Sequence, residues 1–310
     1  MAAVVAPQRP FSGEIPTERR FPLHLEPSIG TIRALYDAAK QARWDPERLV
    51  DWGTFNAARY PATVRDAARL SWSRRAWTEY GGLPETPALI VRFCIEHERE
   101  SDPKYFLTVR NTEEAWHLDC CHRVAEQLGG FVGSPREPAY QALFNQGLHR
   151  EALDIAMPLD AYVAAHSALQ DGLDLELYRL YRDNARDPIV RAVLDQLVAD
   201  KTRHAAFGWF YLTERAPAWD DAARTAISAE LLRVLNDVEL QGFHCAWLVP
   251  NDAAAEIVAA DEITRDAGLG AATETDEKPV LRRFLADAAG QFARIGVMLA
   301  LPDHPALRSA

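Results

Sequence analysis

Apolar residues recur along this chain at spacings of three and four, and strand-like alternation is nearly absent. The pattern therefore predicts an all-α protein. The predicted helices span residues 32–42, 62–80, 86–99, 103–128, 160–184, 188–213, 220–247, 253–265 and 279–299. Clusters of Gly and Pro separate several of them, and we expect the run Gly81–Pro84 to interrupt a helix, with Pro87 leaving a kink.

No segment with the composition of a linker divides the chain. Residues 1–30 are rich in Pro and charged residues without a sustained period, which predicts an N-terminal arm. We expect residues 31–310 to form a single helical domain whose bundle core spans about residues 62–213. A chain of 310 residues is long enough to bury a large core.

Two polar side chains interrupt the apolar stripe of the predicted helix 103–128. Glu114 and His117 are three residues apart, so they share one face of the helix. A carboxylate and an imidazole on such a stripe are costly to bury unless they are paired or bind a metal. Glu-x-x-His is also the half-site of four-helix proteins that bind two metal ions in the bundle core.

A second helix carries a matching pair with one change. Lys201 and His204 lie on the apolar stripe of the predicted helix 188–213. Each pair is preceded by a carboxylate at similar spacing, since Glu85 stands 29 residues before Glu114 and Asp171 stands 30 before Lys201. We predict that the two halves aim these side chains at one interior point.

Three short segments resemble a known family. They are Trp44–Pro46 with the nearby Asp51-Trp52, the run Thr112–His117, and the run Asp200–Ala205. Over about residues 35–215 the chain resembles the ferritin-like di-iron carboxylate family, in the branch of para-aminobenzoate N-oxygenase-like proteins and ribonucleotide reductase small subunits. The resemblance implies a ferritin-like four-helix bundle with extra N- and C-terminal helices.

The resemblance also implies a site. Members of the family hold two iron or manganese ions that activate dioxygen. The matching positions here, as metal ligands, are Glu85, Glu114, His117, Asp171 and His204, with Glu79 as the alternative to Glu85.

Lys201 departs from the family pattern, because the family has a bridging Glu there. An ammonium group has no lone pair and cannot bind a metal. Two unit charges 4 Å apart repel by about 4 kcal/mol at an effective dielectric constant near 20. Such a repulsion would lower metal affinity by about three orders of magnitude.

Three arrangements of Lys201 follow. In the first, Lys201 replaces the metal charge by pairing with Glu114, Asp171 or Glu85, and the site holds one metal or none. In the second, the lysine is modified, for example carbamylated, or acts as a neutral amine. In the third, Lys201 turns away and a di-iron site forms with fewer ligands.

The predicted function is an oxidative tailoring enzyme, an oxygenase or oxidase. It would act on a small-molecule substrate, which the family branch implies to be an amine-bearing secondary metabolite, with dioxygen and one or two iron ions. The alternative is a metal-free protein without a cofactor. Lys201, Asp171 and Glu114 would then perform acid–base catalysis, or the bundle would be a non-catalytic binding scaffold.

Charge and composition narrow the partners. The formal net charge of −11 argues against nucleic-acid and anionic-membrane binding, and no apolar run of about 18 residues exists. Four cysteines show no disulfide or zinc pattern, and the chain starts without a leader-like segment. We therefore expect a cytoplasmic protein, and a homodimer is compatible with this expectation.

Other polar residues near the motifs are predicted to be structural. We expect Glu113 on the solvated side of its helix, and Asp200 and Arg203 in ion pairs with a neighbouring helix. Glu239 and His244 are five residues apart, a spacing that does not place them on one helix face, so we predict structural roles for both.

Overall fold

The computed structural model describes residues 22, 23, 25–96, 101–145 and 147–308. Most of the arm predicted at residues 1–30, and residues 97–99 of one predicted helix, lie outside them. The helices are α1 Gly30–Gln41, α2 Pro46–Leu49, α3 Ala62–Glu96, α4 Asp102–Gln127, α5 Pro138–Phe144, α6 Leu148–Ala152, α7 Leu159–Tyr162, α8 Asp171–Asn184, α9 Pro188–Arg215, α10 Asp221–Asp237, α11 Ala255–Ala267 and α12 Glu274–Arg294. Within the described part of the chain, β-type pairing is limited to one isolated bridge, Ala185 with Leu269. The all-α prediction is therefore confirmed.

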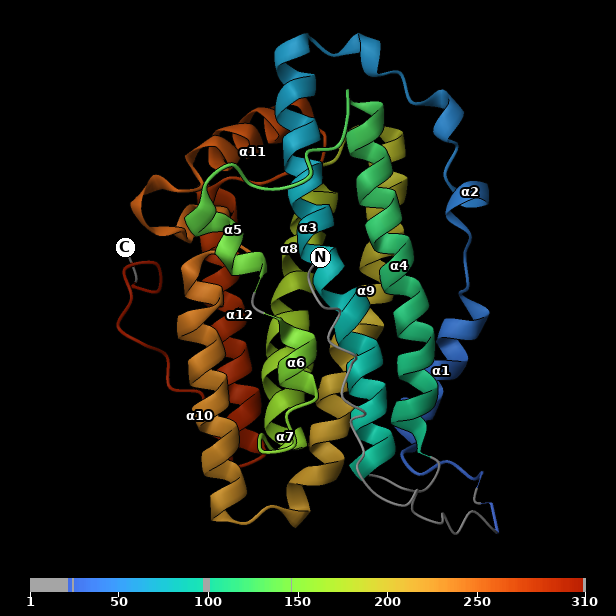
Figure 1. Ribbon diagram of the computed structural model, residues 1–310, viewed down its shortest axis with the longest axis vertical. Helices are drawn as coiled ribbons and strands as arrows, with labels where there is room; N and C mark the ends of the chain where they lie inside the picture. Colours follow the sequence, from blue (N-terminus) through green and yellow to red (C-terminus); the bar gives the residue numbers. More distant parts are fainter. Residues whose placement is uncertain (1–21, 24, 97–100, 146, 309–310) are drawn as a thin grey trace, which may run out of the picture.

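The long helices form a bundle (Figure 1). Helix α3 packs along α4, α8 packs along α9, and α4 contacts α9, which closes the core of the bundle. Helix α1 lies against α4 and α9, whereas α10, α11 and α12 pack on the outside against α7, α3 and α8. Trp72, Phe93, Phe106, Phe207 and Tyr211 are among the largest fully buried side chains.

The first bundle helix is continuous, so the interruption predicted at Gly81–Pro84 is wrong. Helix α3 runs from Ala62 to Glu96 with Pro84 and Pro87 inside it. Each proline removes one backbone donor, a local cost that contact with α4 can offset. Gly82 takes part in this contact, because a Cβ there would lie 2.9 Å from Cδ of Glu114. Continuity sets which side of α3 faces the bundle interior.

The helices near the C-terminus differ from the prediction in their bounds. Helix α10 ends at Asp237 rather than continuing to residue 247, and Gly242 then has a φ of 102°. Helix α12 starts at Glu274, five residues before the predicted start at Pro279. Thr273 and Asp276 form a capping box there, which stabilises the earlier start.

A π-helical segment, Val163–Gln170, joins α7 to α8. The predicted helix 160–184 is therefore one helical rod with a wider turn in its first half. Helix α9 approaches this segment closely, because a Cβ on Gly208 would lie 2.5 Å from the carbonyl carbon of Ser167. π-Helical turns are rare in proteins, and those that occur often lie at functional sites.

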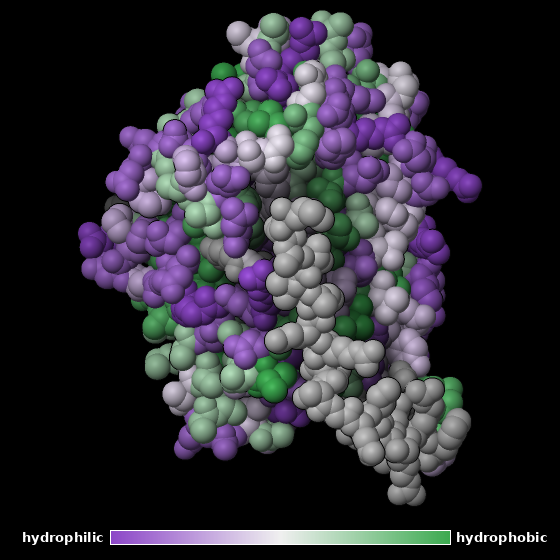
Figure 2. Space-filling model, viewed as in Figure 1, coloured by the Kyte–Doolittle hydropathy of each residue, from purple (hydrophilic) through white to green (hydrophobic). Residues whose placement is uncertain are grey.

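The visible surface is mostly polar. Figure 2 shows hydrophilic residues over the outer helices, with hydrophobic ones mainly in the recesses between them. Among the described residues, no helix is both long enough and apolar enough to span a lipid bilayer.

Candidate functional site

Two histidines from different helices lie next to each other inside the bundle. The ring centroids of His117 on α4 and His204 on α9 are 5.6 Å apart. Their exposed fractions are 0% and 3%. The prediction that both halves direct their imidazoles to one interior point is therefore confirmed.

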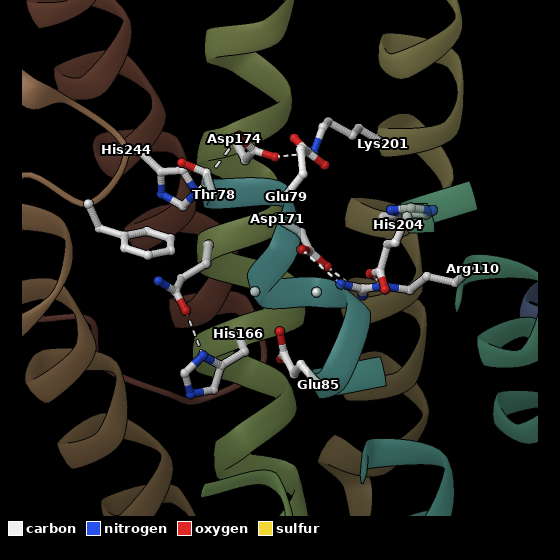
Figure 3. Close-up of a pocket in the computed structure, with 15 residues that line it drawn as sticks. Thr78, Glu79, Glu85, Arg110, His166, Asp171, Asp174, Lys201, His204 and His244 are labelled. Atoms are coloured by element: carbon white, nitrogen blue, oxygen red, sulfur yellow. Dashed lines mark hydrogen bonds and ion pairs between the residues drawn. The ribbon is translucent and has the colours of Figure 1, made fainter. Parts of the chain in front are cut away.

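Lys201 lies in the same interior and makes two ion pairs. Its Nζ is 2.9 Å from Oε1 of Glu79 and 2.5 Å from Oδ2 of Asp174 (Figure 3). Burial lowers the pKa of Lys201, but Asp174 and Glu79 outweigh it and raise the pKa above its usual value, so the group is a cation. The expected pairing with Glu114, Asp171 or Glu85 is wrong, and the outward-turned arrangement is not the one observed.

Glu79, rather than Glu85, is the α3 carboxylate beside the motif residues. Oε2 of Glu79 lies 3.4 Å from Nδ1 of His117, and Oε1 accepts a hydrogen bond of 2.5 Å from the hydroxyl of Tyr178. Burial raises the pKa of Glu79, but Lys201 and His117 outweigh it and hold it well below the usual range. Glu85 instead accepts a hydrogen bond of 2.6 Å from Tyr162.

Arg110 makes a second cationic bridge, which the sequence analysis missed. Its guanidinium lies 2.7 Å from Glu114 and makes bonds of 2.7 and 3.1 Å to the two oxygens of Asp171. The sequence alone could have indicated the contact with Glu114, because Arg110 stands one helical turn before it. Asp174 was also missed, although it lies three residues after Asp171 on the same helix.

The carboxylates bound by Arg110 have raised pKa values. Burial raises the pKa of Glu114 to about 7, against the lowering effect of Arg110. Burial likewise raises the pKa of Asp171 to about 6, again opposed by Arg110. Both groups therefore change protonation close to neutral pH, which is a property of acid–base residues.

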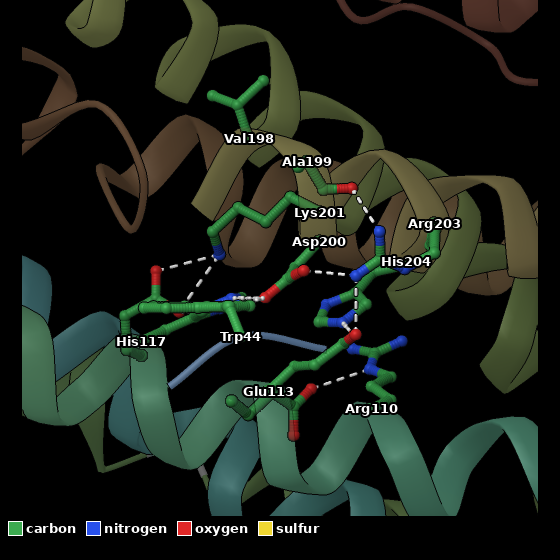
Figure 4. A network of polar contacts seen from close by, with 12 residues as sticks. Trp44, Arg110, Glu113, His117, Val198, Ala199, Asp200, Lys201, Arg203 and His204 are labelled. Carbon is green, nitrogen blue, oxygen red and sulfur yellow. Dashed lines mark hydrogen bonds and ion pairs between the residues drawn. The ribbon is translucent and has the colours of Figure 1, made fainter. Parts of the chain in front are cut away.

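An outer layer of carboxylates holds both imidazoles (Figure 4). Asp200 accepts from Nε2 of His117 at 3.1 Å and from the indole nitrogen of Trp44 at 2.8 Å. Glu113 lies 2.8 Å from Nε2 of His204, and Arg203 contacts both Glu113 and Asp200. The ion pair predicted between Arg203 and a neighbouring helix is confirmed. The expectation of a solvated Glu113 is wrong, since its exposed fraction is 2%.

These partners determine how the rings carry their protons. Burial lowers the pKa of His204 well below its usual value, and Arg110 and His117 lower it further, so the ring is neutral. Its Nε2 donates to Glu113, which leaves Nδ1 as the lone-pair nitrogen. Burial also lowers the pKa of His117, but Asp200 and Glu79 outweigh it and raise the pKa to about 9.

The site borders a cavity of about 60 Å³. Its walls include the charged residues of both bridges. Further polar side chains on the walls are those of Glu85, His166, Gln170 and His244 (Figure 3). The lining residues are Thr78, Glu79, Gly81, Gly82, Glu85, Arg110, Glu114, His166, Gln170, Asp171, Asp174, Lys201, His204, Phe243 and His244. A cavity of this size holds a few water-sized groups rather than a drug-sized ligand.

A larger outer pocket adjoins the cavity. It has a volume of about 530 Å³ and shares Gly81 and Phe243 with the cavity walls. Trp77, Tyr80 and Phe144 are among the aromatic residues that line it. The two hollows therefore adjoin at α3 and at the segment that follows α10.

The two-metal site implied by the resemblance does not fit these side chains. Lys201 and Arg110 are cations without lone pairs, and each lies between two of the carboxylates. Among the described residues, one group of three His, Cys, Asp or Glu side chains has its ligand atoms within 4.8 Å of one another. That group is Glu151, His166 and Glu230 rather than the motif residues.

A single ion beside His117 fits better. Nδ1 of His117 and Oε2 of Glu114 are both buried without a hydrogen-bond partner. An imidazole nitrogen and a carboxylate oxygen are ligands that iron and manganese accept, and an ion here would displace the proton that His117, with its pKa raised to about 9, otherwise carries.

No family model matches the chain, and no curated protein matches it. Among solved structures, the chain is similar to an R2-like ligand-binding oxidase with an aerobically reconstituted metal cofactor after photoconversion. The TM-score is 0.64 at 16% identity, covering 87% of this chain and 94% of that one. A point variant of an R2-like ligand-binding oxidase with a Mn/Fe cofactor gives 0.63 at 15% identity, covering 84% and 92%. A second such variant gives 0.57 at 16% identity, covering 87% and 94%.

At these identities the likeness shows the fold. It confirms the predicted ferritin-like bundle, of the kind seen in R2-like oxidases, with additional helices at both ends. The chemistry of this chain has to be inferred from its own side chains.

Proposed function

We propose that this protein is an oxidase-type ferritin-like enzyme that acts on a small metabolite and holds no more than one metal ion in its central site. The observation that carries the proposal is the pair of buried, unpartnered ligand atoms, Nδ1 of His117 and Oε2 of Glu114. Buried polar atoms normally have a partner, so a missing ligand or ion is the simplest explanation. The fold of R2-like oxidases supports this explanation.

His117 and Glu79, whose Nδ1 and Oε2 lie 3.4 Å apart, would hold the ion. A redox-active ion there would supply electrons for a reaction with dioxygen. Asp200 fixes the ring of His117 through Nε2, so that Nδ1 faces Glu79. Lys201 supplies a positive charge beside Glu79 in place of a second ion.

Substrate size follows from the two hollows. The cavity of about 60 Å³ admits dioxygen or the tip of a small molecule, and the remainder would lie in the outer pocket of about 530 Å³. Phe243 lines both, so Phe243→Ala should widen the passage between them. The resemblance suggests an amine-bearing substrate, and Asp171 and Glu114 offer carboxylates on the cavity wall.

The two cationic bridges favour a second candidate function without metal. Lys201 and Arg110 supply two positive charges beside the four carboxyl groups of Glu79, Asp174, Glu114 and Asp171. Glu114 and Asp171 would then exchange protons with a substrate near neutral pH, since burial raises their pKa values to about 7 and 6. Without turnover, the same cavity would serve as a binding site.

Metal content separates these candidates. The protein would be purified from cells supplied with iron and manganese, together with His117→Gln and Lys201→Glu, and metals would be measured by mass spectrometry. One ion in the wild type that is lost in His117→Gln supports the proposed enzyme. Equal metal content in the wild type and in His117→Gln would support the metal-free candidate. Two ions that depend on His117 would overturn both.

Lys201→Glu tests the charge argument. It restores a carboxylate and removes the repulsion, so we expect it to bind one more ion than the wild type. Intact mass measurement of the wild type detects carbamylation of Lys201 directly. Dioxygen uptake that depends on added small amines, and that is absent in His117→Gln, would demonstrate oxidase activity.

A further inference from the structure

A second cluster of metal-type ligands adjoins the central cavity through His166, which lines the cavity wall. Glu151 on α6, His166 on the π-helical segment and Glu230 on α10 each place one ligand atom within 4.8 Å of the other two. Their side chains are 29%, 2% and 11% exposed. Three separate elements of the fold therefore meet at one small polar point near the surface.

The imidazole in this cluster has an unused nitrogen. Nε2 of His166 is buried and has no hydrogen-bond partner, and Oε2 of Glu151 lies 3.8 Å away. A buried nitrogen left without a partner is unfavourable. Its position beside two carboxylates indicates that the partner is a cation.

Neighbouring hydrogen bonds determine the state of that nitrogen. The amide nitrogen of Gln170 donates to Glu239 at 2.6 Å, so its oxygen faces Nδ1 of His166 at 2.5 Å. An amide oxygen only accepts, and Nδ1 must therefore carry the proton. In the neutral ring, Nε2 is then the nitrogen with the lone pair, and it lies beside the two glutamates. Histidines that bind metals are held in this way, by a hydrogen bond from the second ring nitrogen.

We propose that Glu151, His166 and Glu230 form a binding site for a divalent transition-metal ion of the Zn²⁺ or Mn²⁺ class. One imidazole and two carboxylates match the ligands of these ions, and three protein ligands leave an open position for water. Metal–ligand distances near 2.1 Å require the three atoms to approach by less than about 1 Å each. Mg²⁺ prefers oxygen ligands alone and should bind weakly here.

Arg233 is the competing cation at this point. Its Nη2 lies 2.9 Å from Glu151 and 2.6 Å from Glu230, so it holds the two carboxylates together. Two carboxylates and one guanidinium leave a net charge of −1, which still attracts a divalent ion. Arg233 is 35% exposed and can move outward. Replacing it with Gln removes the competing charge, so it should tighten rather than weaken metal binding.

An ion at this point would join α6, α10 and the π-helical segment. It would also end a polar chain that reaches the central site. Glu239, which accepts from Gln170, lies 2.8 Å from His244, and His244 lies 3.7 Å from Asp174, the partner of Lys201. Glu239 and His244, predicted to be structural, thus connect the two sites.

The test uses Zn²⁺ binding to the whole chain, measured by competition with a chromophoric chelator, with Mg²⁺ as the contrasting ion. Glu151→Gln changes a partly exposed side chain and should fold normally. His166→Gln removes the imidazole ligand. Glu214→Gln, on an exposed part of α9, removes the same charge away from the site and serves as the matched control. His117→Gln separates this site from the central one.

We expect Glu151→Gln and His166→Gln to weaken Zn²⁺ binding at least tenfold, with Glu214→Gln and His117→Gln unchanged for this site. Zn²⁺ should also raise the melting temperature of the wild type but not of Glu151→Gln. In crystals soaked with Zn²⁺, an anomalous peak should lie between the three ligand atoms. Equal affinity in all variants, or a peak only beside His117, would overturn the proposal and leave an ion-pair cluster around Arg233.

Discussion

Lys201 holds its ammonium 2.9 Å from Oε1 of Glu79, across the bundle from α9 to α3. Asp174 on α8 completes this bridge, and Arg110 makes a similar one from Glu114 to Asp171. Each bridge joins α8 to a carboxylate from the α3–α4 pair. Two fixed cations thus bridge four carboxyl groups in the part of the bundle where the resemblance implies two metal ions.

Removing the ammonium should destabilise the fold. In Lys201→Met, Glu79 and Asp174 remain buried without their counter-charge. Loss of one partner of a buried ion pair costs about 3–5 kcal/mol. Urea unfolding at pH 8 measures the change, and Lys201→Arg serves as the charge-retaining control. Equal stability of the Met and wild-type proteins would show that the bridge contributes nothing.

The loss of Arg110 should depend on pH. Arg110 lowers the raised pKa values of Glu114 and Asp171, so it stabilises their ionised forms. This contribution is present above those pKa values and disappears as the pH falls and both carboxyls become protonated. Arg110→Met should therefore lose more stability at pH 8 than at pH 5. The same loss at both pH values would contradict the assigned partnership.

A buried carboxyl outside the central site provides an independent pH test. Burial raises the pKa of Glu277 from 4.5 to about 7, although Tyr181 and Trp247 each donate to it at 2.8 Å. The folded state then binds the proton more tightly than the unfolded state. Wild-type stability should consequently fall as the pH rises from about 4.5 to 7.

Glu277→Gln removes this ionisation. The variant should gain up to about 3 kcal/mol relative to the wild type between pH 5 and pH 8, although its absolute stability is lowered by the changed hydrogen bonds. Denaturant unfolding of both proteins across this range provides the measurement. Parallel pH profiles would show that Glu277 is not the titrating group.

The close contact between α9 and the π-helical segment should tolerate no added methyl group. A Cβ at Gly208 would lie 2.5 Å from the backbone of Ser167, so the helices would have to separate. We expect Gly208→Ala to cost 1–3 kcal/mol or more. Gly290 on α12 has nothing within 4 Å of such a Cβ, and Gly290→Ala should be neutral or stabilising by up to about 1 kcal/mol. Thermal unfolding of the two variants distinguishes packing from helix propensity.

Local sequence determined the helices and the inward direction of the motif residues. The stripes that carry His117 and Lys201 have a helical period, and a stripe of apolar residues must face the core. Asp187 caps the start of α9, and Gly129-Gly130 follows the end of α4, since caps and stops depend on neighbouring residues. For these reasons the all-α class and the meeting of His117 with His204 were predictable.

Only the tertiary structure decided which charges meet. Whether Glu79 or Glu85 lies beside His117 depends on the continuity of α3 through its prolines, which packing against α4 decides. Whether Lys201 pairs with Asp171 or Asp174 depends on how α8 and α9 are offset along their axes. The spacing of residues within one helix contains no information about that offset, because it arises from side-chain packing between helices. The pairing of Arg110 with Asp171, and the meeting of His166 with Glu151 and Glu230, were invisible in the sequence for the same reason.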